Sequence, residues 1–230
     1  MEKFIGTKID QNIVSTHEVV AESKKYSSSA SIATELGGLA MKFARIERAP
    51  RYDEKTRENN AEHSFMLSLV ATELASELYA EQMNSGLITQ YAIVHDLIEI
   101  KTGDTKTFHY DKKDMAKKHN EEQKTLGDLL NELPPYTAQL LREYESQEVP
   151  EARFVKAVDK LLPVIVDILG FGKKVMREDY GVTDVDTLKA SYLKLHTRIA
   201  TSFAEFPQIV EAHELLCELF AIEFDITQKR

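Results

Sequence analysis

Residues 87–100, Leu-Ile-Thr-Gln-Tyr-Ala-Ile-Val-His-Asp-Leu-Ile-Glu-Ile, decide how this chain can fold and what it can bind. The segment is apolar around most of a helical circumference, which predicts a helix buried on nearly every side. His95 and Asp96 interrupt the apolar run, and a carboxylate buried there without a partner would be costly. A bound cation removes that cost. On a helix, Glu99 shares a face with both residues, so ligands and a further carboxylate can share one pocket.

His63 lies on a second expected helix, over residues 60–83. Asn59 followed by Glu62 is the sequence pattern of a capping box, which marks the start of a helix. Apolar residues repeat at helical spacing after His63, so its side chain is expected to face the core. Taken alone, such a histidine is more often a core residue satisfied by the backbone than a metal ligand.

Asp159 lies on a third expected helix, over residues 151–172. Apolar residues at spacings of three, four and seven place it on the core face. Pro163 cannot donate a hydrogen bond to the carbonyl of Asp159, so the helix is expected to bend there. Taken alone, Asp159 could instead be an ordinary ion-pair partner of Lys156 or Lys160.

Together these side chains predict a metal site. Two imidazoles and two carboxylates suit a borderline divalent ion such as Zn, Mn, Co, Fe or Ni, and nitrogen ligands argue against calcium. Four protein ligands leave positions for water and substrate. We predict one divalent transition metal ion of unspecified identity, bound by His63, His95, Asp96 and Asp159.

The order of these residues resembles the HD-domain metal-dependent phosphohydrolases, and the flanking sequence is similar to their 5′-deoxynucleotidase branch. The resemblance covers about residues 30–200 and rests on Arg48, Glu62-His63, His95-Asp96-x-x-Glu99, Thr102-Gly103-Asp104 and Phe154-Val155-Lys156-x-x-Asp159. It implies an all-α HD-domain helical bundle with a buried metal site. It also implies an enzyme that hydrolyses deoxynucleoside 5′-monophosphates to deoxynucleoside and phosphate.

The resemblance further implies roles for three residues around the metal. Arg48 binds the substrate phosphate, for which its planar guanidinium is suited. Glu99 handles the attacking water, as an acid–base residue one helical turn from the ligands can. Asp104 positions the sugar or assists catalysis. Structural alternatives stay open, because Arg48 could pair with Glu47 or Glu54 at the surface and Asp104 could bond only the backbone of its own turn.

Two other functions also stay open. The same metal centre could release triphosphate from a deoxynucleoside triphosphate, and Lys101 and Lys106 keep that possibility. A non-catalytic nucleotide sensor could retain the HD fold, although it would be expected to lack a ligand or the carboxylate. Some relatives have Trp directly after the arginine, where it helps to judge the sugar. This chain has Ala49, which leaves base and sugar preference open.

Only helices are predicted in this chain of 230 residues, which is long enough to bury one large core. Residues 1–30 form an N-terminal extension, and residues 31–225 form the HD phosphohydrolase domain. Arg48 is expected where the first helix ends and a loop begins. Helices are expected near residues 31–47, 60–83, 87–100, 113–132, 136–146, 151–172, 185–204 and 207–224.

Composition limits the partners. The net charge of -9 leaves no electrostatic footprint for duplex nucleic acid, so a small nucleotide is expected. Cys217 is the only cysteine, which excludes an intramolecular disulfide and fits a reducing cytoplasm. Neither a signal-peptide core nor a membrane-spanning apolar run is recognised. We therefore expect a soluble cytoplasmic protein with no membrane partner, and the resemblance implies a homodimer or higher homo-oligomer.

Overall fold

A computed structural model describes residues 28–104 and 125–226 of the chain. The chain divides into two compact units, Met1–Lys42 and Phe43–Arg230. The described part of the first unit is residues 28–42 of helix α2 (Ser28–Phe43), which starts and ends earlier than expected. Every other element named below, including each candidate site residue, belongs to the second unit.

The all-α fold class is confirmed, and a short antiparallel hairpin that opens the second unit is a local exception to the prediction of helices alone. Strand β1 (Glu47–Arg51) pairs with β2 (Arg57–Asn59) through an irregular register. Asp53 stabilises the connecting turn, because its carboxylate accepts hydrogen bonds from the backbone N–H groups of Lys55 and Thr56 at 2.7 and 2.8 Å. Arg48 therefore lies on a strand rather than at the junction of a helix and a loop.

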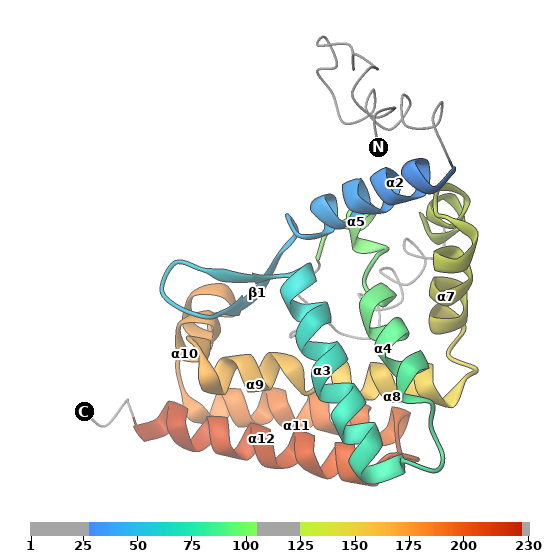
Figure 1. Ribbon diagram of the computed structural model, residues 1–230. Helices are drawn as coiled ribbons and strands as arrows, with labels where there is room; N and C mark the ends of the chain where they lie inside the picture. Colours follow the sequence, from blue (N-terminus) through green and yellow to red (C-terminus); the bar gives the residue numbers. More distant parts are fainter. Residues whose placement is uncertain (1–27, 105–124, 227–230) are drawn as a thin grey trace. The chain divides into compact units, whose positions relative to one another are not determined.

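Helix α3 (Asn60–Tyr79) begins at the expected capping box. The Asn59 side chain accepts from the backbone N–H groups of Ala61 and Glu62, and the Glu62 carboxylate accepts from the Asn59 N–H. This double cap fixes the first turn of α3, which carries His63. Helix α4 (Ser85–Val94) packs along α3 (Figure 1).

The expected helix over residues 87–100 is interrupted at its polar pair, so the prediction of one continuous helix is wrong. Helix α4 ends at Val94, residues 95–98 form a turn, and the short α5 (Glu99–Thr102) follows. The His95 ring donates from Nδ1 to the Ala92 carbonyl at 2.9 Å. In a continuous helix that carbonyl would accept from the N–H of Asp96, so the side chain competes with the helix.

The expected helix over residues 151–172 is likewise two helices. Helix α8 (Pro150–Asp159) follows α7 (Pro135–Ser146), and α9 (Leu162–Leu169) follows α8 after a break at Lys160 and Leu161. Pro163 lies in the first turn of α9, where its missing N–H costs little. The helix is interrupted directly after Asp159, at the place where Pro163 predicts a bend. Residues 125–132 are also helical, and the rest of the helix expected over 113–132 lies outside the described residues.

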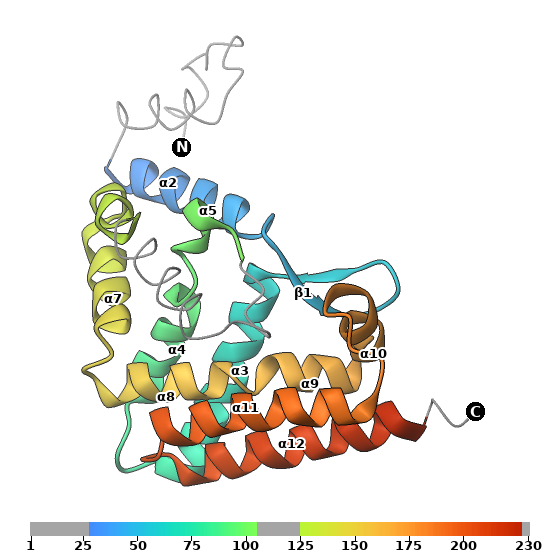
Figure 2. The same cartoon turned by 180° about the vertical axis from the view of Figure 1, so that it is seen from behind.

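The C-terminal part contains α10 (Gly172–Lys174), a π-helix (Val175–Asp179), α11 (Val185–Ser202) and α12 (Pro207–Ile226). Figures 1 and 2 show α9, α11 and α12 side by side. Within the described ranges, every helix is too short or too polar to span a lipid bilayer. The buried residues that join these elements include Val164, Met176, Leu188, Tyr192, Phe220 and Phe224.

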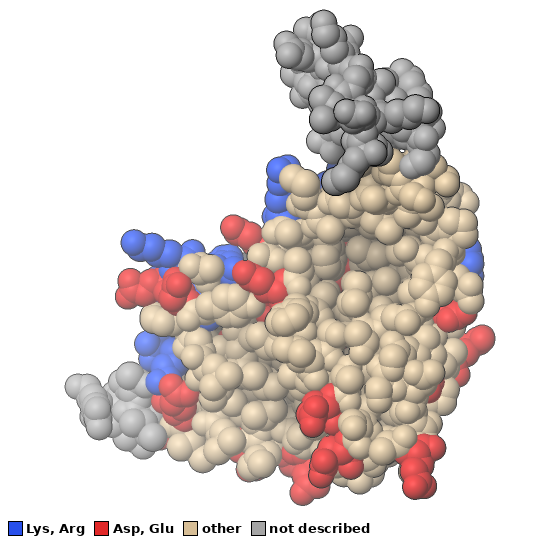
Figure 3. Space-filling model, in the orientation of Figure 1, with Lys and Arg blue, Asp and Glu red and all other residues tan. Residues whose placement is uncertain are grey.

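The face formed by α3 and α4 carries exposed apolar side chains, Phe65, Leu69 and Ile93. In Figure 3 the centre of this face has few charged residues, and acidic side chains gather toward its lower edge. Neighbouring exposed apolar side chains are typical of contact surfaces.

Candidate metal centre

The structure brings the four predicted ligands together. His63 lies in the first turn of α3, and His95 and Asp96 lie in the turn between α4 and α5. One ligand atom from each of these three residues lies within 4.8 Å of the others. Asp159, the last residue of α8, places Oδ1 2.9 Å from His63 Nε2 and 3.8 Å from His95 Nε2. Within the described residues, His63, His95 and Asp96 are the one group of at least three histidine, cysteine or acidic side chains whose ligand atoms lie this close together.

His95 presents a nitrogen suited to a metal. Because its Nδ1 donates to the Ala92 carbonyl, Nε2 carries the lone pair in the neutral ring. This Nε2 is buried and has no hydrogen-bond partner among the described residues, although Asp96 Oδ2 lies 3.0 Å away. The Tyr144 ring packs against the imidazole in a T-shaped arrangement, with ring centroids 6.0 Å apart. The Ala92 carbonyl and the Tyr144 ring therefore orient the His95 imidazole, and its Nε2 lies beside Asp96 and Asp159.

His63 is held between two carboxylates. Its Nε2 donates to Asp159 Oδ1, and its Nδ1 lies 3.3 Å from Glu58 Oε2. Glu58 is fully buried on β2 and also lies 3.3 Å from Arg48 Nε. A carboxylate behind a metal-binding imidazole, as Glu58 is behind His63, orients the ring and increases its basicity. Glu58 was not predicted from the sequence, because the three-residue strand that carries it is too short to show an alternating pattern.

The charges of the site leave room for a divalent cation. Five carboxylates gather here, those of Glu58, Asp96, Glu99, Asp104 and Asp159, and the neighbouring fixed cations are Arg48 and Lys160. Asp159 pairs with Lys160 through Oδ2 and with His63 through Oδ1, so the ion pair proposed as an alternative coexists with the ligand position. The acidic excess needs a further cation or bound protons.

The pKa values show where protons compensate this excess. Burial and Arg48 lower the pKa of His63, but its contacts with Asp159 and Glu58 outweigh them and raise it to about 9. Burial and the charge of Asp96 raise the pKa of Glu99 to about 8. Burial also acts to raise the pKa of Asp96, but His95 and Arg48 hold it well below its usual range. A metal ion can take the place of these protons, so the residues present fit the ion that their pattern predicts.

Arg48 extends from β1 into the acidic cluster. Its Nη1 donates to Asp96 Oδ2 at 2.7 Å and to Asn60 Oδ1 at 3.2 Å, and its side chain is 11% exposed. Burial opposes its charge, but the surrounding carboxylates raise its pKa above the usual value. The alternative of a surface ion pair with Glu47 or Glu54 is therefore wrong.

Glu99 lies beside the ligands at the start of α5. Its Oε2 accepts from Asn60 Nδ2 at 2.8 Å and lies 3.7 Å from Arg48 Nη1. Asn60 is fully buried and bridges Glu99 and Arg48, a role that the sequence analysis missed. Asn60 follows the capping residue Asn59 directly, and nothing in the sequence distinguishes the inward amide from the capping one.

Asp104 also faces the cluster, with Oδ1 3.9 Å from Arg48 Nη1. It follows Gly103, whose φ of 72° turns the chain away from α5. The Lys101 ammonium instead pairs with Glu132 at 2.7 Å. Lys106 lies outside the described residues.

A cavity of about 150 Å³ extends from this cluster. One end of the cavity is lined by the predicted ligand Asp159 together with Arg48, Asp104 and Lys160, and we call it the metal-proximal end. Its distal end lies between α9, the π-helix and α11, and is lined by Val164, Asp167, Val175, Met176, Tyr180 and Tyr192. The cluster of polar side chains therefore opens into a space with largely apolar walls.

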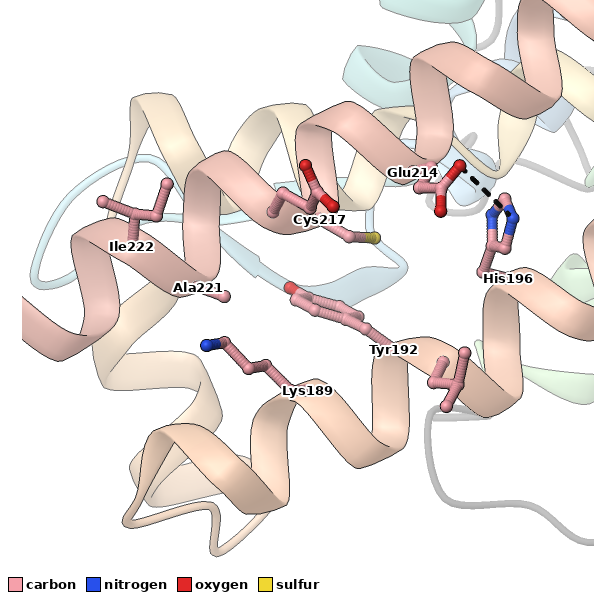
Figure 4. Close-up of a pocket in the computed structure, with 9 residues that line it drawn as sticks. Lys189, Tyr192, His196, Glu214, Cys217, Ala221 and Ile222 are labelled. Carbon is pink, nitrogen blue, oxygen red and sulfur yellow. Dashed lines mark ion pairs between the residues drawn. The ribbon is translucent and has the colours of Figure 1, made fainter.

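A larger hollow, of about 450 Å³, lies between α11 and α12 (Figure 4). His196 and Glu214 form its ion pair, at 3.9 Å. The buried Cys217 also lines it, and burial raises the pKa of this thiol to about 12. Such a protonated thiol is a poor nucleophile and a poor metal ligand, so size alone does not make this hollow the candidate site.

The comparisons with known proteins agree with this geometry. The chain matches the HD domain family over residues 42–199, more than half of its length, and it therefore belongs to the HD domain family. It is also similar to a crystal structure of a predicted metal-dependent phosphohydrolase from Magnetospirillum magnetotacticum MS-1. That similarity has 28% sequence identity and a TM-score of 0.63, and covers 86% of this chain and 96% of the other. A comparison with curated proteins gave no match.

Proposed function

We propose that this protein is a metal-dependent phosphohydrolase that releases orthophosphate from deoxynucleoside 5′-monophosphates. The observation that carries the proposal is the convergence of two imidazoles, two carboxylates, Arg48 and Glu99 beside a cavity that Arg48 and Asp159 line. The similar bacterial structure, described as a predicted metal-dependent phosphohydrolase, supports the same reaction class.

His63, His95, Asp96 and Asp159 would hold one divalent ion, and their mixed nitrogen and oxygen donors suit Co, Mn, Zn, Fe or Ni. Such an ion supplies Lewis-acid chemistry, neutralising phosphate oxygens and acidifying water.

The remaining side chains supply binding and proton transfer. The contacts of Arg48 with described residues use Nε and Nη1, so Nη2 would donate to a phosphate oxygen. Glu99, held by Asn60, would accept the proton of the attacking water. Asp104, across from Arg48, would hold the sugar.

The alternatives have less support. An enzyme that releases triphosphate would need lysine or arginine side chains to bind the second and third phosphates. The candidate Lys101 is instead paired with Glu132. A non-catalytic sensor would be expected to lack a ligand or Glu99, and all of these residues converge.

A metal-by-nucleotide screen tests the proposal. Protein stripped with a chelator is reloaded with each candidate metal and given deoxynucleoside mono-, di- and triphosphates, and the products are separated by ion chromatography. We expect orthophosphate from monophosphates with at least one transition metal and none with calcium alone. Accumulation of triphosphate would favour the alternative enzyme, and no product with any metal would contradict both.

A further inference from the structure

Asp167, on α9, is a buried carboxyl that the proposed reaction does not use. It is 5% exposed, and its Oδ1 has no hydrogen-bond partner among the described residues. Burial, with a smaller effect of Glu58, raises the pKa of Asp167 to about 8. A polar atom buried without a partner destabilises a fold, so its presence at a cavity wall points to a ligand as the missing partner.

The surroundings of Asp167 hold it in a fixed position. Gly172 packs against it so closely that a Cβ there would lie 2.4 Å from the Asp167 Cα. Gly170 packs equally closely against the Arg51 carbonyl, which accepts from the Phe171 N–H at 2.9 Å. The segment after α9 is therefore fastened to the hairpin that carries Arg48.

The π-helix, which forms another wall of the cavity, is also connected to that hairpin. Asp179, the last residue of the π-helix, accepts from Arg57 at 2.8 Å and lies 3.4 Å from Arg51. Val175 and Met176 of the same π-helix line the cavity, and π-helical turns occur frequently at functional sites. The distal end is thus a preformed space whose walls are connected to the metal-proximal end.

Apart from Asp167, the distal end combines aliphatic side chains with the rings of Tyr180 and Tyr192. Asp167, Tyr180 and Tyr192 line the same cavity, and burial and the Asp167 charge both raise the pKa of the two tyrosines. Apolar walls with few polar groups are typical of sites that bind a flat organic ring and fix its orientation.

We propose that the distal end binds the leaving alcohol of the phosphomonoester, and that Asp167 Oδ1 accepts a hydrogen bond from an N–H or O–H of that group. This inference rests on the proposed function and assigns Asp167 as a residue that determines specificity. In a nucleotide, the donor is an N–H of the base or a hydroxyl of the sugar.

The test compares Asp167→Leu, which keeps the size of the side chain, and Asp167→Ala, which adds no bulk, on three substrates. Deoxyadenosine 5′-monophosphate offers base and sugar donors, deoxyribose 5-phosphate offers only sugar hydroxyls, and phenyl phosphate offers neither. Both variants should lower kcat/KM for the nucleotide about tenfold, equivalent to about 1.4 kcal/mol, and leave phenyl phosphate unchanged. If kcat/KM for deoxyribose 5-phosphate is unchanged in the variants, the donor belongs to the base. If this kcat/KM falls, the donor belongs to the sugar.

Asp167→Asn keeps an acceptor oxygen and should restore most of the nucleotide activity. Asp167 also borders a second hollow lined by Lys173 and Lys174, so Lys174→Ala serves as the control and should behave as wild type. Equal losses on all three substrates, or no loss on any, would overturn the inference.

Calorimetric binding of free deoxyadenosine separates this inference from the proposed function. We expect weaker binding by Asp167→Leu and Asp167→Ala than by wild type, and equal binding would overturn the role of Asp167. Absence of phosphate release by the metal-loaded wild type would refute the proposed function, while the nucleoside titration would still test Asp167.

Discussion

The two ends of one cavity differ in how their charges are satisfied. At the metal-proximal end, Arg48 contacts carboxylates from a strand, a turn and a short helix, and Asp159 contacts both a histidine and a lysine. At the distal end a single carboxyl, Asp167, lies among apolar and aromatic side chains with one oxygen unpartnered by described residues. Under the proposed function, the charged end would perform the chemistry and the apolar end would select the leaving group.

Loss of a ligand at the charged end should have the largest effect. Asp96→Ala is expected to reduce phosphate release by more than roughly 10⁴-fold, beyond the loss typical of an acid–base residue. The reduction should be equal for nucleotide and phenyl phosphate, because both depend on the metal. Glu214→Ala, in the hollow between α11 and α12, is the matched control and should retain full activity. Wild-type rates for Asp96→Ala in a malachite-green assay would remove Asp96 from the site.

Glu99→Gln should have the next largest effect. The amide keeps a hydrogen-bonding group toward Asn60 but cannot accept a proton from water, so kcat should fall by about 10²- to 10⁴-fold. The metal content should stay at the wild-type level, which distinguishes this variant from a ligand variant. Glu77→Gln, on the exposed face of α3, is the control. An unaltered kcat would show that Glu99 takes no part in the reaction.

Arg48→Lys should have a smaller effect. Lysine keeps the positive charge that balances Asp96 and Glu58 but loses the planar fork of donors. We expect KM to rise about tenfold, roughly 1.4 kcal/mol, with a lesser change in kcat. Steady-state kinetics against Arg153→Lys, at the exposed ion pair with Glu205, provide the comparison. Identical KM values in the two variants would argue against phosphate binding by Arg48.

The last prediction concerns the pH dependence of folding stability rather than the reaction rate, and it applies to Asp167 at the distal end. Because the pKa of Asp167 rises from 3.8 to about 8 on folding, the folded state binds its proton more tightly. This contribution to stability is present at low pH and is lost as pH rises toward 8. Asp167→Leu should therefore show a shallower decline of unfolding free energy between pH 4 and 8 in urea titrations. Parallel curves for the variant and wild type would mean that Asp167 titrates normally.

The site could be predicted from the sequence to the extent that it depends on residue type and order. His63, His95, Asp96, Glu99 and Asp159 were identified because polar side chains interrupt apolar helical patterns, and the capping box of α3 was predicted to the residue. The all-α class followed from the same periodicity, and the bend predicted from Pro163 falls where α8 ends and α9 begins.

The rest could not be predicted because it depends on contacts distant in sequence. The hairpin is too short for an alternating pattern to show, and its partners Asp179 and Phe171 lie more than a hundred residues away. The end of α4 depends on the His95 side chain taking a backbone carbonyl, which a helical pattern does not reveal. Asp167 was missed because one carboxylate in an apolar helix looks the same whether it faces solvent or a cavity.

Metal stoichiometry tests the central claim most directly. Chelator-stripped wild type and the Asp159→Ala and Glu77→Gln variants can be dialysed against Mn²⁺ or Co²⁺, and bound metal measured by plasma mass spectrometry on protein whose fold is verified by circular dichroism. Convergence of His63, His95, Asp96 and Asp159 predicts about one ion per chain in wild type and Glu77→Gln, and a large loss in Asp159→Ala. Folded wild-type protein that binds no stoichiometric metal, or an Asp159→Ala variant that binds it as tightly as wild type, would contradict the account.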